Sequence, residues 1–202
     1  MAKVAEAVQI PGPVGELDTL YMAAEGECHA LAVICHPNPL QGGTHTNKVV
    51  QSTARALSQM GYACYCPNLR GVGLSTGRHD HGEGEVDDVL AVVDHARQVH
   101  GALPLLLAGF SFGAFVAARA RTRIEAEQLL LIGVAVGKYV LPTPEVPANT
   151  LVIHGEADEV IPLSAVLDWA RPQQLPVIVF PGVGHFFHGS LVQLANCIKR
   201  CL

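Results

Sequence analysis

Apolar residues follow two rhythms along this chain, and the two alternate from residue 30 to the end. Short unbroken apolar runs predict strands covered on both faces, whereas apolar residues at every third or fourth position predict helices with one buried face. Two earlier segments, 3–10 and 16–24, predict strands joined by a turn rich in proline and glycine. The later strands are expected at 30–35, 62–67, 103–108, 128–136, 150–154 and 176–180, and the helices at 46–60, 85–99, 112–122, 163–170 and 189–201.

This alternation favours a largely parallel sheet, because parallel neighbours need a long crossover connection and a helix usually supplies it. The chain has 202 residues, of which 50% are hydrophobic and 15% charged, so it can bury a substantial core. No linker, internal repeat or low-complexity tract divides it. We therefore expect one α/β domain over residues 1–202, a three-layer sandwich with helices on both faces of a mostly parallel sheet.

Charge and composition argue against several classes of protein. The net charge of −5 disfavours nucleic acid as the main partner, and no apolar run reaches the roughly 18 residues of a membrane span. Residues 1–6 lack the apolar core of a signal peptide, which predicts a cytoplasmic location. The six cysteines form no C-x-x-C pair and are expected to be reduced thiols that pack like small apolar side chains. The oligomeric state is left open.

The pattern G-x-S-x-G at 109–113 stands where an apolar strand run ends and an alanine-rich helix begins. A sharp strand-to-helix turn of this kind strains its apex residue and brings neighbouring backbone close, which explains the flanking glycines. It would lift the Ser111 hydroxyl above the sheet as a candidate nucleophile. A purely structural turn with a surface serine is the alternative.

A serine nucleophile needs a base, and the base needs an acid that orients it. In a parallel sheet both are expected on loops that follow strands, at the carboxyl edge. The loop after strand 150–154 carries Asp158, with Glu156 and Glu159 as competing carboxylates. The loop after strand 176–180 carries His185, with His188 three residues on as a competing base. The order serine, acid, histidine is that of the G-x-S-x-G hydrolases.

Five segments together resemble the α/β-hydrolases, and more narrowly the small lidless bacterial serine hydrolases of that superfamily. Dienelactone hydrolase is a better-known relative, although it uses cysteine where this chain has serine. The resemblance implies that Ser111 is the nucleophile, Asp158 the acid and His185 the base. The segments that carry it are 36–43, 70–75, 109–113, 154–158 and 184–189.

An acyl-transfer site also needs backbone donors for the oxyanion. One is expected from Phe112, the residue after the nucleophile. The second is expected from loop 36–43, where the two prolines carry no N–H and leave Asn38 or Leu40. The resemblance favours Asn38.

Four other features are assigned no chemistry. The cluster His79-Asp80-His81 has no usual metal-ligand spacing and is expected to be a solvated loop. The glycine-rich segment 71–77 lacks the pattern of a phosphate-binding loop. Arg70 is expected to brace loops by salt bridges, and His154 to be a hydrogen-bonded structural histidine. We expect no metal and no cofactor.

These features predict a serine carboxylesterase that acts on a small-molecule ester. A thioesterase or peptidase with the same residues, or a non-catalytic binding protein with this fold, are the alternatives. Residues 137–149 contain three prolines and are too few for a helical cap. The site should therefore be shallow, bordered by Phe112, Leu40, Tyr139 and Phe186, with short acyl groups preferred.

Overall fold

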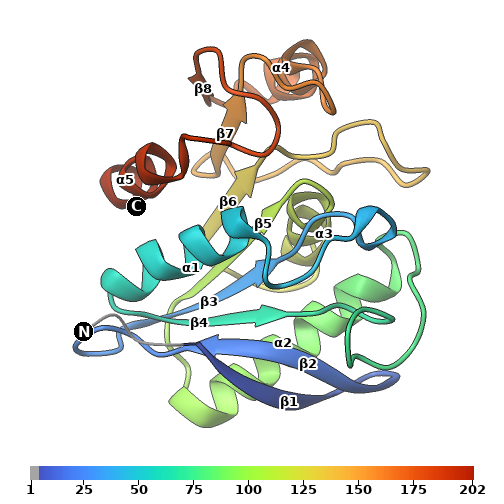
Figure 1. The fold of residues 1–202 in the computed structure, drawn as a ribbon, viewed down its shortest axis with the longest axis vertical. Coiled ribbons are helices and arrows are strands. Elements are labelled where there is room, and N and C mark those ends of the chain that lie inside the picture. Colours follow the sequence, from blue (N-terminus) through green and yellow to red (C-terminus); the bar gives the residue numbers. More distant parts are fainter. Residues whose placement is uncertain (1–4) are drawn as a thin grey trace.

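A computed structural model of the chain describes residues 5–202. The described strands form one eight-stranded sheet in the order β1-β2-β4-β3-β5-β6-β7-β8 (Figure 1). The pairs β1–β2 and β2–β4 are antiparallel, and all other neighbours are parallel. The strands are β1 (Glu6–Gly12), β2 (Gly15–Met22), β3 (Ala30–Cys35), β4 (Tyr62–Pro67), β5 (Leu105–Phe110), β6 (Gln128–Ile132), β7 (Leu151–Gly155) and β8 (Val177–Phe180).

Helices cover both faces of this sheet and complete the three predicted layers. On one face α1 lies beside α5, and the opposite face carries α2 and α3, with α4 on that same side (Figure 1). The predicted α/β fold class is confirmed, and the single-domain interpretation of residues 1–202 stays a prediction. The helices are α1 (Lys48–Gln59), α2 (Gly84–His100), α3 (Phe112–Arg121), α4 (Leu163–Ala170) and α5 (Leu191–Cys201).

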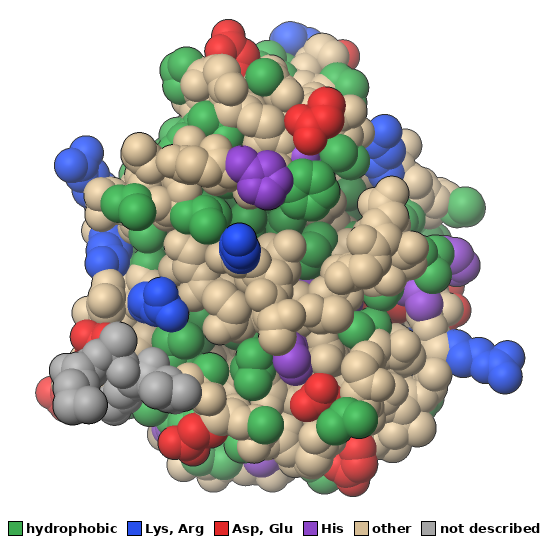
Figure 2. Space-filling view, viewed as in Figure 1, with side chains coloured by type: hydrophobic (Ala, Val, Ile, Leu, Met, Phe, Trp, Pro, Cys, Tyr) green, Lys and Arg blue, Asp and Glu red, His purple; other side chains and the backbone are tan. Residues whose placement is uncertain are grey.

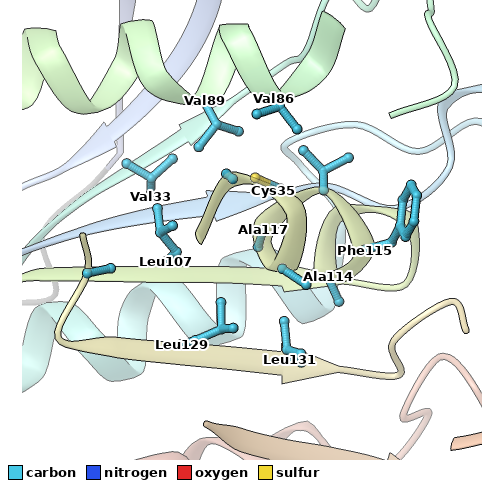
Figure 3. Close-up of a cluster of buried hydrophobic side chains, with 14 of the residues drawn as sticks. Val33, Cys35, Val86, Val89, Leu107, Ala114, Phe115, Ala117, Leu129 and Leu131 are labelled. Atoms are coloured by element: carbon cyan, nitrogen blue, oxygen red, sulfur yellow. The ribbon is translucent and has the colours of Figure 1, made fainter. Parts of the chain in front are cut away.

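The core is divided by the sheet into two apolar clusters, one on each face. In the cluster of α2 and α3, small side chains of α3 bring that helix close to the sheet (Figure 3). Ala114 and Ala117 are fully buried there, opposite Leu107 and Leu131 of the central strands. This close packing fixes where α3 begins, which is where the candidate nucleophile lies.

Some predicted boundaries are wrong. The run 128–136 is apolar throughout, but β6 ends at Ile132 because Gly133 takes a left-handed φ of 53° and turns the chain away. The first hairpin is tighter than predicted, with β1 extending to Gly12 and β2 beginning at Gly15. Residues 3 and 4 of the first predicted strand lie outside the described part of the chain.

The connection between β6 and β7 contains no helix, so no cap covers the carboxyl edge of the sheet there. Between residues 5 and 202, no helix has both the length and the apolar character needed to cross a bilayer. All six cysteines are free thiols, as predicted, and three of them are buried in the sheet.

Candidate active site

Ser111 occupies the turn between β5 and α3, with φ 56° and ψ −115°. A positive φ is costly for a residue with a side chain, so the surroundings must hold it there. The backbone N–H of Ser111 donates to the Ile132 carbonyl at 2.9 Å, which ties the turn to β6. The side chain is thereby presented at the carboxyl edge of the parallel strands, as the G-x-S-x-G pattern predicts.

The two glycines of the pattern are required by close backbone approach. A Cβ at Gly109 would lie 2.1 Å from the Gly113 carbonyl oxygen, and a Cβ at Gly113 would lie 2.2 Å from the Cys35 carbonyl oxygen. Any side chain at either position would force backbone apart. The sharp turn therefore depends on glycine on both sides of Ser111.

Hydrogen bonds join the three predicted residues into one chain. Nε2 of His185 lies 2.9 Å from the Ser111 hydroxyl oxygen, and Nδ1 of His185 lies 2.7 Å from Oδ2 of Asp158. Asp158 follows β7 and His185 follows β8, so three separate loops converge at one edge. All three side chains are largely buried, with His185 only 2% exposed.

Asp158 is held as a carboxylate by several donors. Its Oδ1 accepts from the backbone N–H groups of Val160 at 2.9 Å and Ile161 at 2.6 Å. Burial alone raises the pKa of Asp158, but the hydrogen bonds from His185 and the two backbone donors outweigh it and hold the pKa below its usual value. The ionised acid is therefore the resting form, which suits a group that orients an imidazole.

The competing residues have other partners. Glu156 accepts from the backbone N–H of Gly182 at 2.8 Å, and Glu159 accepts from that of His185 at 3.2 Å. Asp158, and neither glutamate, is the partner of the His185 imidazole; the glutamates instead connect the Asp158 loop to the His185 loop. His188 is exposed, and it is His185 that reaches the Ser111 hydroxyl.

Loop 36–43 lies beside the serine and has two backbone N–H groups of interest. Leu40 donates its N–H to the side chain of Asn38 at 2.9 Å, so that donor is already used. In the described part of the chain, the backbone N–H groups of Asn38 and Phe112 make no hydrogen bond. Phe112 is also the first residue of α3, where the helix leaves its first N–H groups free.

His36 fixes the start of this loop. Its Nε2 accepts the Leu69 N–H at 3.0 Å, and its Nδ1 therefore carries the proton and donates to the Pro37 carbonyl at 2.7 Å. Burial lowers the pKa of His36 to about 4, outweighing the opposing effect of the Pro37 carbonyl. A neutral imidazole thus joins the ends of β3 and β4 beneath the candidate oxyanion loop.

Two small hollows meet at Ser111. The smaller, about 70 Å³, is lined by His185, Phe186 and the loop from Pro37 to Asn47. The larger, about 190 Å³, is lined by Ala135, Lys138, Tyr139, Val160 and Ile161. Asn38, Gln41 and Ser111 border both. A groove of about 500 Å³ between α1 and α5 is larger still, but none of its lining residues belongs to the hydrogen-bonded chain.

Comparison with known proteins identifies the family of this chain. Residues 27–149, which include Ser111 but neither Asp158 nor His185, match the model of the family described as serine aminopeptidase, S33. The chain belongs to this family. It is therefore an α/β-hydrolase, and its class of activity is that of a hydrolase.

Solved structures and a sequence relative agree with this assignment. A lidless α/β serine hydrolase of Xanthomonas campestris has 38% identity and a TM-score of 0.92, covering 98% of this chain and 93% of its own. An α/β serine hydrolase homologue of Coxiella burnetii has 37% identity and a TM-score of 0.90, covering 98% and 97%. An uncharacterised protein of Rickettsia prowazekii (strain Madrid E) is 30% identical over 95% of this chain and 86% of its own. The predicted resemblance to lidless serine hydrolases is confirmed, and that to dienelactone hydrolase stays a prediction.

The predicted border of this hydrolase's site needs two corrections. Tyr139 and Phe186 line the hollows, but Leu40 is exposed and lines neither. The Phe112 side chain is fully buried, packed against Tyr139 with ring centroids 5.1 Å apart, so only its backbone can face a ligand. Gln41 and Lys138 also line the hollows and were not predicted, although each lies on a loop that the sequence singles out.

The histidine cluster at 79–81 differs from expectation at one residue, His79. His79 is mostly buried, with Nδ1 2.7 Å from a Glu85 carboxylate oxygen and its ring 5.2 Å from that of Phe112. His79 is therefore a packing residue, whereas Asp80 and His81 are exposed, as expected of a solvated loop. Across the described residues, no three histidine, cysteine or acidic side chains converge as a metal site would require. Arg70 pairs with buried Asp88 at 2.8 Å, which confirms its bracing role.

Proposed function

We propose that this hydrolase is a serine carboxylesterase that cleaves small carboxylic esters. The observation that carries the proposal is the buried chain of hydrogen bonds from Ser111 through His185 to Asp158. Each member has the partner that its role needs, and the distances lie within hydrogen-bond reach. The small volumes beside Ser111 support a small substrate over a polypeptide.

The first half of the reaction forms an acyl-enzyme. Ser111 Oγ attacks the ester carbonyl carbon while Nε2 of His185 takes the hydroxyl proton. Asp158 accepts a hydrogen bond from Nδ1, which fixes the tautomer and stabilises the imidazolium that forms. The carbon–oxygen bond to the alcohol then breaks, and the imidazolium returns its proton to the departing oxygen.

The second half releases the acid. His185 takes a proton from a water molecule that attacks the acyl carbon, and the bond to Ser111 Oγ breaks as that oxygen regains a proton. In both halves the negative oxygen needs preorganised donors. We assign this role to the backbone N–H groups of Phe112 and Asn38, because both lack another partner among the described residues while that of Leu40 is occupied.

A phosphonate probe that reacts with nucleophilic serines tests the assignment. The wild-type protein should be labelled at Ser111, and Ser111→Ala should abolish both labelling and hydrolysis of p-nitrophenyl acetate. His185→Ala should also lose nearly all turnover, whereas His188→Ala provides a matched control on the same loop and should retain it. Hydrolysis that survives in Ser111→Ala would overturn the proposal.

A further inference from the structure

The two hollows at Ser111 differ in their relation to the candidate base. His185 lines the smaller hollow and is not among the lining residues of the larger one. In ester hydrolysis the histidine must donate a proton to the leaving alcohol oxygen, so the alcohol has to lie beside it. The smaller hollow is then the alcohol side, and the larger hollow receives the acyl group.

The larger hollow has an unusual combination of lining groups. Ala135 and Ile161 are buried and form an apolar floor, while Lys138 lies exposed at its edge. Lys138 is the one charged residue lining it, and no acidic side chain lines it in the described chain. The ammonium of Lys138 also makes no ion pair or hydrogen bond within the described residues.

Tyr139 also lines this hollow and adds no negative charge to it. The Tyr139 hydroxyl has no hydrogen-bond partner within residues 5–202, and burial raises its pKa to about 12, so it remains a donor at neutral pH. Glu85 lies near enough to influence Tyr139, but His79 is its ion-pair partner. Lys138 is thus the cation of this hollow, and no acidic side chain among the described lining residues neutralises it.

The geometry points to an acyl group that ends in a carboxylate, so that the substrates are short half-esters of dicarboxylic acids with a small alcohol. The methylene carbons lie on the apolar floor and the carboxylate binds Lys138. A volume of about 190 Å³ suits an acyl chain of a few carbons and no more. This inference rests on the proposed function and names the substrate class of that same site.

The test compares two methyl esters of nearly equal size, methyl hydrogen succinate and methyl butyrate. The first has a carboxylate where the second has a methyl group. We expect the wild-type protein to prefer the succinate, measured as the ratio of the two kcat/KM values. Lys138→Gln should lower this ratio about fivefold, the factor that an exposed ion pair contributes at its upper end. Lys138→Glu should lower it further, and Lys138→Arg should retain it.

Two controls separate this inference from general charge effects. Lys48 is exposed at the start of α1 and lines neither hollow, so Lys48→Gln changes the net charge equally and should leave the ratio unchanged. Added salt should lower the ratio in the wild-type protein and have little effect in Lys138→Gln, because salt screens an exposed pair.

The inference is overturned if the ratio is the same in wild type and Lys138→Gln. It is equally overturned if Lys138→Gln lowers the kcat/KM of acetoxyacetate, an ester whose carboxylate lies on the alcohol side. The two hollows would then be assigned the wrong way round. If either result is obtained while Ser111→Ala is inactive, the proposed esterase function still stands. Hydrolysis that persists in Ser111→Ala would instead remove the proposed function itself.

Discussion

His36 gives this protein a specific sensitivity to acid. Its imidazole is fully buried, accepts the N–H of Leu69 and donates to the carbonyl of Pro37, an arrangement that only the neutral form can make. Burial, together with the neighbouring His45 and His79, lowers its pKa from 6.5 to about 4 despite the opposing hydrogen bond to the Pro37 carbonyl. In the unfolded chain the same side chain titrates near 6.5. As the pH falls below 6.5 the unfolded state therefore takes up the proton first and is stabilised relative to the folded state.

The magnitude follows from the gap between the two pKa values. Each unit corresponds to about 1.4 kcal/mol, so the full loss between pH 6.5 and 4 is about 3 kcal/mol. Between pH 7 and pH 5 the loss is about 2 kcal/mol, a large share of the stability of a typical domain. Above pH 7 this group has almost no effect on stability.

Urea unfolding followed by circular dichroism at pH 5, 6 and 7 measures this loss. His36→Gln provides the comparison, because its side-chain oxygen can still accept from Leu69 but does not titrate. We expect the wild-type protein to lose about 2 kcal/mol more than the variant between pH 7 and pH 5. The other titrating groups, His154 among them, are present in both proteins and cancel in the difference. Equal losses in the two proteins would refute the reasoning.

Three further predictions concern the site and its support. Asp158→Asn should lower the turnover of p-nitrophenyl acetate by orders of magnitude, ~10⁴ in the best-studied triad. Glu156→Gln and Glu159→Gln should lower it only mildly, and a large loss in either variant would assign the role of the acid to that glutamate. Gly113→Ala should lower the free energy of unfolding, measured in urea, by about 2–3 kcal/mol or prevent folding, because its Cβ meets backbone; a loss no larger than that of Ala114→Gly would contradict this. The kcat/KM of p-nitrophenyl esters should be highest for short acyl chains, and a steady rise through long chains would show a tunnel that a hollow of about 190 Å³ does not provide.

The fold was predictable because its signals are local. Buried strands such as β3 and β5 are unbroken apolar runs, and helices such as α1 show one apolar face, so period and length separate them. The error at β6 has the same origin, since residues 128–136 stay apolar after the strand has ended. Apolar character indicates that a residue is buried but not the direction in which the chain runs. The sign of the turn in the sequence was a single glycine, Gly133.

The positions of Ser111, Asp158 and His185 were predictable because parallel strands bring their following loops to one edge. The finer features depend on the conformation of loops, and loops have no regular pattern of apolar and polar residues. The side chain of Asn38 accepts a hydrogen bond from the Leu40 N–H within a tight turn. Without that turn, the sequence does not show which of the Asn38 and Leu40 N–H groups is free. The exposure of Lys138 beside the site likewise follows from the path of an irregular loop.

The strand that leads to His185 is the last in the sheet, and it is the shortest. β8 has four residues, all only half-buried, and its single neighbour is β7. Edge strands of this kind open first in native-state fluctuations, at a free energy below that of global unfolding. The fully buried ring of Phe187, packed on Phe180 at 5.6 Å, is the anchor that opposes such opening. We therefore expect amide hydrogens of β8 to exchange with solvent faster than those of the fully buried β5, so that the imidazole is carried by a less stable part of the sheet than the nucleophile.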